Sequence, residues 1–192
     1  GSWEHSESFC VLDYPVSELN GKTLGIVGAG ELGLGVAKIA KAFEMNVVFA
    51  SLPDRQHSKQ NNRIPFQEVL AGSDILSLHC PLTSLTNRII SHDELSLMKQ
   101  TSILINTARG ALVDEVALRD ALITGKIAGA ATDVLSEEPP LNGNILLDKS
   151  IPNLIITPHV AWIARESRQR LLDQVAGNVR AFLAGKPRNQ VC

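Results

Sequence analysis

Short apolar runs alternate with longer segments of mixed polarity along most of this chain. The runs have the length and composition of buried strands and fall at residues 23–28, 46–50, 74–79, 101–106, 127–134 and 153–157. Several segments between them place apolar residues at helical spacing, over residues 31–43, 66–72, 91–99 and 113–125. Strands that alternate with helices require right-handed crossovers. The pattern therefore predicts a doubly wound α/β domain whose mostly parallel sheet is covered by helices on both faces.

The two ends of the chain differ from this central pattern. Residues 1–20 lack a clear period and are predicted to form an arm, whereas residues 21–160 form the domain itself. Residues 161–192 are predicted to carry a long C-terminal helix over residues 161–184, with an apolar stripe that consists of Leu171, Val175, Val179, Phe182 and Leu183. Within the domain, Ser91 and Glu94 have the spacing of a capping box, which marks a helix start.

Composition narrows the class of protein. The chain is 44% hydrophobic and 20% charged, which is ordinary for a globular domain, and its formal charge is −2. No run of lysines or arginines suggests a nucleic-acid partner, and no apolar stretch is long enough to span a membrane. The three cysteines, Cys10, Cys80 and Cys192, provide neither a disulfide framework nor a metal-site spacing. We therefore expect a cytoplasmic protein without a metal.

A glycine-rich turn follows the first predicted strand. The sequence GAGELG, from Gly28 to Gly33, fits the pattern G-x-G-x-x-G and leads directly into a predicted helix. Gly28 permits a tight turn, Gly30 lets a pyrophosphate approach the backbone, and Gly33 lets the helix lie close to the strand. A tight turn without a ligand is the alternative. In this context the motif predicts a Rossmann-type domain that binds NAD or NADP.

The end of the second predicted strand bears on the choice of cofactor. A carboxylate is expected about twenty residues after the glycine turn, where it binds the adenosine ribose. Ser51 occupies that place, and Asp54 and Arg55 follow it. Ser51 and Arg55 suit a 2′-phosphate, although Asp54 could bind a ribose hydroxyl instead. The sequence therefore predicts tolerance of NADP.

Polar residues follow three of the later strands. Arg109 follows the fourth strand, the pair Glu137-Glu138 follows the fifth, and His159 follows the sixth. Each has an ordinary explanation when taken alone: a surface ion pair, a solvated loop or a turn residue. In a parallel sheet, however, all three lie at the carboxyl edge, where the dinucleotide would bind. A guanidinium suits a carboxylate or carbonyl oxygen, and a histidine beside a carboxylate suits proton transfer.

Motifs in a fixed order extend over nearly the whole chain: ELNGKTLGIVGAGELG, LHCPLT, INTARGALVDE, GAATDVLSEEPP and ITPHVAW. Together they resemble the NAD(P)-dependent D-2-hydroxyacid dehydrogenases. The segments FCVLDYPVSELNGKTLGIVG and TPHVAWIARESRQRLLD favour the glycerate dehydrogenase (hydroxypyruvate reductase) branch. Ser51 departs from the family pattern, which has an acidic residue at that position.

The resemblance assigns roles to individual residues. It implies that Arg109 orients a 2-oxo acid, that Glu138 rather than Glu137 pairs with His159, and that His159 is the proton donor. It also implies that Asp133 contacts the nicotinamide amide. The other positions that it places at the cofactor are Glu31, Leu32, Ser51, Cys80, Pro81, Thr107, Ala108 and Ala161.

The resemblance further implies the reaction and the partners. We expect reduction of a small 2-oxo acid, hydroxypyruvate or glyoxylate, to a D-2-hydroxy acid, and a homodimer to which residues 1–20 contribute. Family members have a substrate-binding segment of about a hundred residues before the cofactor domain. The helix after residue 161 would return to that segment, so its apolar stripe must otherwise be exposed, fold back or pack on another subunit. The alternative is a dinucleotide-binding module, or a corepressor-like NAD(H) sensor, without turnover.

Overall fold

The computed structural model of the protein describes residues 2–7, 9–11, 16–52 and 63–190. One residue of the predicted cofactor site, Arg55, lies outside this part of the chain, as does its neighbour Asp54. The rest of the predicted site is described.

Seven parallel strands form a single sheet in the order β3-β2-β1-β4-β5-β6-β7. Leu24 of β1 is aligned with Val47 on one side and with Ile75 on the other. The order reverses at β1, which confirms the doubly wound α/β prediction. The strands are β1 (Thr23–Val27), β2 (Asn46–Ala50), β3 (Arg63–Ile64), β4 (Ile75–Leu78), β5 (Ile103–Asn106), β6 (Gly129–Thr132) and β7 (Leu154–Ile156).

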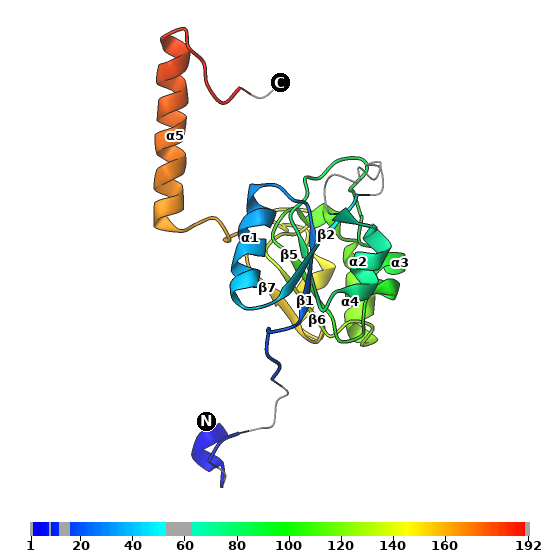
Figure 1. The fold of residues 1–192 in the computed structure, drawn as a ribbon. Coiled ribbons are helices and arrows are strands. Elements are labelled where there is room, and N and C mark those ends of the chain that lie inside the picture. Colours follow the sequence, from blue (N-terminus) through cyan, green and yellow to red (C-terminus); the bar gives the residue numbers. More distant parts are fainter. Residues whose placement is uncertain (1, 8, 12–15, 53–62, 191–192) are drawn as a thin grey trace.

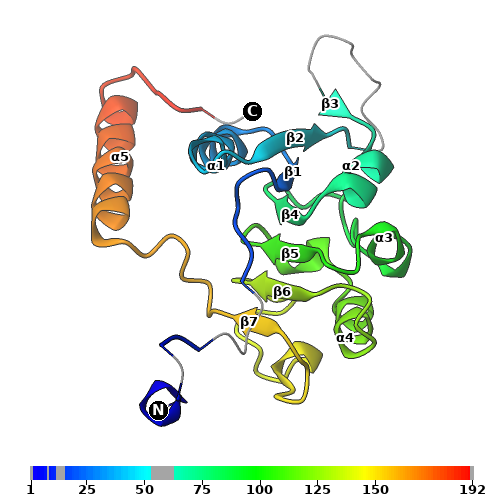
Figure 2. The same cartoon turned by 60° about the horizontal axis from the view of Figure 1, so that its bottom comes forward.

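Helices lie on both faces of the sheet, as Figure 1 and Figure 2 show. One face carries α2 (Phe66–Gly72), α3 (His92–Leu97) and α4 (Glu115–Ile123), and the other carries α1 (Glu31–Ala42). The larger core cluster packs beneath α2 to α4, where Val69, Leu95 and Leu118 are buried. A smaller cluster joins α1 to the sheet; it consists of Leu24, Ile26, Ala37, Ala40 and Met45. Burial of these side chains holds the sheet between its two helical layers.

Helices lie on both faces as predicted, but the coverage of the α1 face is incomplete. Ile103 of β5 is 41% exposed, although it is aligned with Ile75, which packs against the α1 cluster. Ile155 of β7 is 66% exposed. The physical reason is that the helix following β7 does not return to the sheet, so α1 is the one described helix that covers this face (Figure 2).

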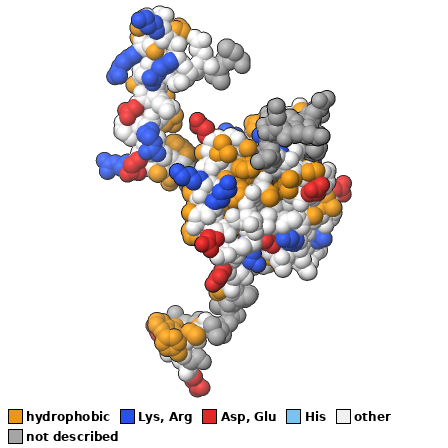
Figure 3. All heavy atoms as spheres, in the orientation of Figure 1, with side chains coloured by type: hydrophobic (Ala, Val, Ile, Leu, Met, Phe, Trp, Pro, Cys, Tyr) orange, Lys and Arg blue, Asp and Glu red, His pale blue; other side chains and the backbone are white. Residues whose placement is uncertain are grey.

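That last helix, α5 (Arg165–Leu183), stands away from the domain (Figure 1). It contains no buried residue, and its apolar stripe is exposed, from Leu171 at 51% to Leu183 at 78%. Of the three arrangements considered for the stripe, exposure is therefore the observed one. The helix begins at Arg165 rather than at residue 161, because residues 157–164 form turns tied to the end of β6. Figure 3 shows hydrophobic side chains on α5 and on the domain surface.

Local signals place most of the helix ends correctly. The backbone N–H of Ser91 donates to Glu94 Oε2 at 3.0 Å, which confirms the capping box, and Gly125 follows α4 with a φ of +66°. The short strand β3 was not predicted. Three 3₁₀ helices also add to the predicted elements, namely η1 (Ser2–His5), η2 (Gly110–Leu112) and η3 (Ile145–Leu147). No helix in the described ranges is long and apolar enough to cross a membrane.

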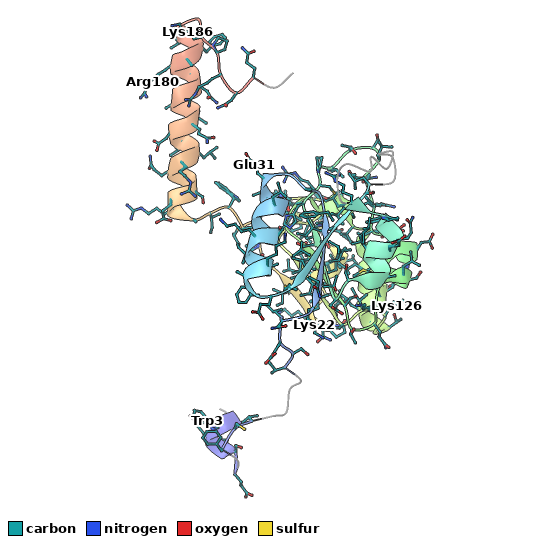
Figure 4. The ribbon with its side chains drawn as sticks, viewed as in Figure 1. Trp3, Lys22, Glu31, Lys126, Arg180 and Lys186 are labelled. Carbon is teal, nitrogen blue, oxygen red and sulfur yellow. The ribbon has the colours of Figure 1, made fainter. Side chains whose placement is uncertain are left out.

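The shared strand direction defines two ends of the domain. Lys22 and Lys126 precede β1 and β6, and both lie at one end in Figure 4. Glu31, which follows β1, lies at the opposite end. That second end is the carboxyl edge of the sheet, where the predicted site residues are expected to gather.

Candidate active site

The glycine turn joins β1 to α1 at the carboxyl edge. Gly28 has a φ of +108°, and a Cβ placed there would lie 2.5 Å from the carbonyl carbon of His79. A Cβ at Gly33 would lie 2.0 Å from the carbonyl oxygen of Gly28. By contrast, no atom lies within 4 Å of a Cβ built at Gly30. The absence of side chains at Gly28 and Gly33 thus lets the turn pack closely against its neighbours. The backbone at Gly30 faces open space, as close approach of a pyrophosphate requires.

The N-terminus of α1 opens onto the same space. The N-cap residue is Gly30, whose backbone is extended. Because glycine has no side chain, no side-chain hydrogen bond caps the helix. The first N–H groups of a helix lack intrahelical acceptors and attract anions together with the helix dipole. Glu31 is the first helical residue, and the side chain of Leu32 is 76% exposed. The turn, the open backbone and the helix start fit the diphosphate of a dinucleotide.

The remaining cofactor candidates follow the ends of neighbouring strands. Ser51 follows β2; it is buried, and its N–H donates to the carbonyl oxygen of Ile64 at 2.8 Å. Cys80 and Pro81 follow β4, and burial raises the pKa of the Cys80 thiol. Thr107 and Ala108 follow β5. The sheet topology therefore brings all of these positions to the edge that carries the glycine turn.

Asp133 joins the ends of β5, β6 and β7. Its N–H donates to the carbonyl oxygen of Asn106 at 2.9 Å, and its carbonyl oxygen accepts from the N–H of His159 at 2.8 Å. Its carboxylate accepts the N–H groups of Val160 and Ala161, both at 2.8 Å, and the hydroxyl of Thr157. Burial by itself raises the pKa of Asp133, but these hydrogen bonds outweigh it and hold the pKa below its usual value.

His159 has a backbone conformation that is uncommon for its residue type. Its φ is +54°, in the left-handed region, where a residue other than glycine costs about 1–3 kcal/mol. The hydrogen bonds that Asp133 accepts from the backbone N–H groups of residues 159–161 offset this cost. Asp133 therefore fixes the direction in which the histidine side chain leaves the backbone.

Glu138 and His159 form a pair at this edge. Glu138 Oε2 lies 2.7 Å from His159 Nδ1, and Glu138 Oε1 accepts the N–H of Leu135 at 2.8 Å. Glu137 instead accepts the side-chain amide of Asn142 at 3.2 Å, so Glu138 is the residue of the two that faces the histidine. The side chains of Glu138 and His159 are 34% and 44% exposed, which leaves them accessible to a ligand.

Arg109 reaches the same edge but does not join the pair. Its side chain is exposed, and Nη1 donates to the carbonyl oxygen of Ala108 at 2.6 Å. Within the described part of the chain, the guanidinium forms no ion pair. Most of its donors are therefore directed to solvent, from which an anionic ligand could approach.

Asn106 and Thr157 belong to this arrangement and were not predicted. Asn106 is buried at the end of β5; its side-chain amide donates to the carbonyl oxygen of Arg109 at 2.9 Å, and its Oδ1 accepts the N–H of Ala108 at 3.1 Å. An asparagine that ends the apolar run ILIN is the signal that could have identified it. Thr157 gave no comparable signal, because its role depends on Asp133, which is distant in sequence.

A cavity of about 570 Å³ adjoins the Glu138–His159 pair. Its walls are largely apolar, with Leu135, Pro139, Pro140, Leu147 and Ile156, and the two paired side chains line it as well. A carboxylate fixed at Nδ1 leaves Nε2 as the ring nitrogen able to exchange a proton with a ligand. The edge thus combines a glycine turn open to an anion, an exposed guanidinium and a histidine suited to acid–base chemistry.

Comparison with known proteins gives a consistent result. Residues 2–161 match the family described as D-isomer specific 2-hydroxyacid dehydrogenase, NAD binding domain. The chain is 49% identical over 192 residues to a glycerate dehydrogenase of Methylorubrum extorquens, and 41% identical over 193 residues to a hydroxypyruvate reductase of Blautia hydrogenotrophica. Each match covers 100% of this chain but only 59% of the relative. The chain therefore spans somewhat more than half the length of these relatives.

Solved structures show the same fold. An acyclic imino acid reductase in complex with NADPH and D-Arg matches with a TM-score of 0.85 at 34% identity. That match covers 100% of this chain and 60% of the other.

Proposed function

Because this chain belongs to the D-isomer specific 2-hydroxyacid dehydrogenase family, we propose that it is the cofactor-binding part of an enzyme that reduces a small 2-oxo acid. Hydroxypyruvate and glyoxylate are the substrates that we propose, with D-glycerate and glycolate as the products. The names of relatives support this choice: a glycerate dehydrogenase, a hydroxypyruvate reductase and a glyoxylate reductase of Aeropyrum pernix.

The observation that carries the proposal is the Glu138–His159 pair at the edge that also holds the glycine turn. The 2.7 Å contact orients the imidazole through Nδ1, so that Nε2 can donate its proton to the substrate oxygen as the alcohol forms. Glu138 Oε2 at 2.7 Å is the acceptor that holds the Nδ1–H of the ring during this step. A bound dinucleotide supplies the hydride for the carbonyl carbon. We assign the proton donor to His159 and its orienting carboxylate to Glu138.

Arg109 is the residue that we assign to the substrate. Its exposed guanidinium offers a planar set of donors that matches the oxygen atoms of a 2-oxo acid. Asn106 holds the backbone of Arg109 from within the sheet, so the side chain starts from a fixed point. Asp133 is assigned to the nicotinamide amide. Its Oδ2 accepts only the Ala161 N–H from described residues, which leaves this oxygen able to accept a second donor.

The choice of nucleotide follows from the end of β2. Ser51 places no carboxylate at that position, so residue 51 does not repel a 2′-phosphate, while Asp54 stays the alternative partner for a ribose hydroxyl. We therefore propose that NADPH is accepted as well as NADH, with Arg55 as a candidate for the additional phosphate.

We also propose a homodimer formed through the cofactor domain, with residues 1–20 contributing. Large apolar side chains are exposed both in that segment and on α1, including Trp3 at 73%, Phe9 at 96% and Ile39 at 61%. Light scattering after size exclusion should give twice the chain mass. Cytoplasmic location remains a prediction.

Two parallel measurements test the reaction. Fluorescence titration with NADH and NADPH measures binding to the chain, and loss of nicotinamide absorbance on addition of hydroxypyruvate or glyoxylate measures turnover. Turnover is assayed for the chain and for the full-length reading frame. Binding with turnover in the full-length protein supports the dehydrogenase, whereas binding without turnover of either acid supports the alternative of a dinucleotide-binding module or NAD(H) sensor.

A further inference from the structure

Glu115, the first residue of α4, binds the segment that carries Glu138. Its Oε1 accepts the N–H of Ser136 at 2.8 Å, and its Oε2 accepts the hydroxyl of the same serine at 2.6 Å. Ser136 lies two residues before Glu138 in the sequence. One carboxylate of α4 is therefore hydrogen-bonded to the chain immediately before the proposed orienting residue.

The same carboxylate also holds the far end of this segment. Glu115 Oε2 accepts the side-chain amide of Asn144 at 2.8 Å, and Asn144 Oδ1 accepts the N–H of Leu146 at 2.9 Å. Asn144 is the N-cap residue of η3, where the chain rejoins regular structure. Residues 136–144 thus form a loop that is tied to Glu115 at both of its ends.

Close backbone packing adds a second constraint on the loop. A Cβ built at Gly110 would lie 1.9 Å from the carbonyl carbon of Leu135 and 2.4 Å from the nitrogen of Ser136. The chain after Arg109 is therefore in direct contact with the start of the loop. Leu135 in turn donates its N–H to Glu138 Oε1 at 2.8 Å. The Glu138 carboxylate is thus hydrogen-bonded to a residue whose backbone packs against Gly110.

We propose that Glu115 is a positioning residue that sets the distance between Glu138 and His159 by clamping residues 136–144 onto the start of α4. Its catalytic consequence rests on the function proposed above. Glu115 hydrogen-bonds to neither Glu138 nor His159, so it acts through the loop alone. Its side chain is partly buried, and removing it leaves donors of Ser136 and Asn144 without their acceptor.

The first test concerns the chain itself and does not depend on turnover. Two-bond ¹H–¹⁵N NMR in mildly alkaline buffer reports which ring nitrogen of His159 carries the proton. The native chain should show the Nδ1–H tautomer, because Glu138 accepts at that nitrogen. Glu115→Ala should shift the ¹⁵N signals toward a mixture of the two tautomers. Asp120→Ala is the matched control, since Asp120 is another α4 carboxylate and pairs with Arg119 instead.

The second test concerns the full-length enzyme. Glu115→Ala should lower kcat about tenfold and change KM for NADH by less than about twofold, since a displaced acid–base group slows the chemical step without weakening nucleotide binding. The double variant Ser136→Ala/Asn144→Ala removes the two side-chain hydrogen bonds to Glu115 and keeps the one from the Ser136 N–H, so it should reproduce part of the effect. Adding Glu115→Ala to the double variant should then lower kcat by less than Glu115→Ala does in the native enzyme. This double variant takes over both tests if Glu115→Ala fails to fold.

An unchanged His159 tautomer in the variant would overturn the positioning role, whatever the enzyme does. The same conclusion would follow if the native chain itself showed no preference for Nδ1–H. If the native full-length protein turned over no 2-oxo acid, the proposed function would fail, while the NMR result would still decide the role of Glu115.

Discussion

The two halves of the carboxyl edge are built from different parts of the chain. At the glycine turn, the site consists of backbone: Gly30 faces open space, and the start of α1 has no side-chain cap. Around His159 the site consists of side chains, with Asp133, Glu138 and Asn106 each hydrogen-bonded to a neighbouring strand end or loop. Ligand binding at the glycine turn should therefore be lost when a side-chain atom is added. The function of the part around His159 should be lost when a polar side-chain atom is removed.

The largest effect is expected at the glycine turn. Gly33→Val adds a side chain where a Cβ alone would lie 2.0 Å from the carbonyl oxygen of Gly28. We expect dinucleotide binding to be lost and the free energy of unfolding to fall by about 3 kcal/mol. Gly30→Ala is the matched control, because its Cβ has room. It should weaken binding while stability stays within about 1 kcal/mol. Fluorescence titration measures dinucleotide affinity, and urea unfolding measures the free energy of unfolding. Equal losses of stability in the Gly33 and Gly30 variants would contradict this account of the turn.

Arg109 tests the side-chain half. Arg109→Lys keeps the charge but loses the planar fork, so we expect kcat/KM for the 2-oxo acid to fall about 100-fold in the full-length enzyme. The affinity for NADH should change less than about twofold. Arg88→Lys is the control, since Arg88 is 69% exposed and faces Asp114. Steady-state kinetics decide the outcome. An Arg109 variant with native kcat/KM would remove this residue from the substrate site.

Asp133 should make the side-chain half sensitive to pH. Its pKa is held below the ordinary value of 3.8, so the ionised carboxylate stabilises the fold above that pH. This contribution is lost as the pH falls through the lowered pKa. Asp133→Asn should therefore reduce the free energy of unfolding by about 2 kcal/mol at neutral pH. Denaturant unfolding from pH about 7 down to about 3 should show the difference shrinking at the acid end. A difference independent of pH would contradict the assignment.

The smallest effect is expected at Ser51, where the two cofactors are compared. Ser51→Asp restores a carboxylate at the end of β2, which should repel a 2′-phosphate and accept from a ribose hydroxyl. Affinity for NADPH should fall about tenfold, and affinity for NADH should change by less than about twofold. Ser51→Asn has nearly the same shape without the charge and is the control. Equal changes for both nucleotides would show that this position does not distinguish them.

The sequence predicted those features of the fold that depend on short patterns. Strand polarity and the shared edge of the Glu137-Glu138 pair and His159 follow from apolar runs and the parallel topology, and the glycine turn follows from its motif. The family resemblance was needed to select Glu138 as the partner of His159. The short strand β3 was missed because Arg63 and Ile64 give too short an apolar signal beside a long polar loop. The start of α5 was placed four residues early, because the turns after β7 depend on Asp133, which follows β6.

The contacts that fix the candidate site were less predictable. The capping residue Asp114 and the neighbouring Glu115 look alike in sequence, yet Asp114 accepts from its own helix while Glu115 binds a loop about twenty residues away. Thr157 and Asn144 are likewise defined by distant partners. Such hydrogen bonds join residues that are distant in sequence and meet only in the folded chain, and local periodicity does not predict these meetings. The incomplete cover of the α1 face likewise depends on where the chain runs after β7, because α5 does not return to the sheet.

The most direct test of the acid–base assignment is a single-turnover measurement on the full-length enzyme with its His159→Asn variant. With NADH bound and hydroxypyruvate in excess, the loss of nicotinamide absorbance should slow about 1,000-fold in the variant, while NADH binds with native affinity. Native turnover in the variant would show that the imidazole beside Glu138 is not the proton donor.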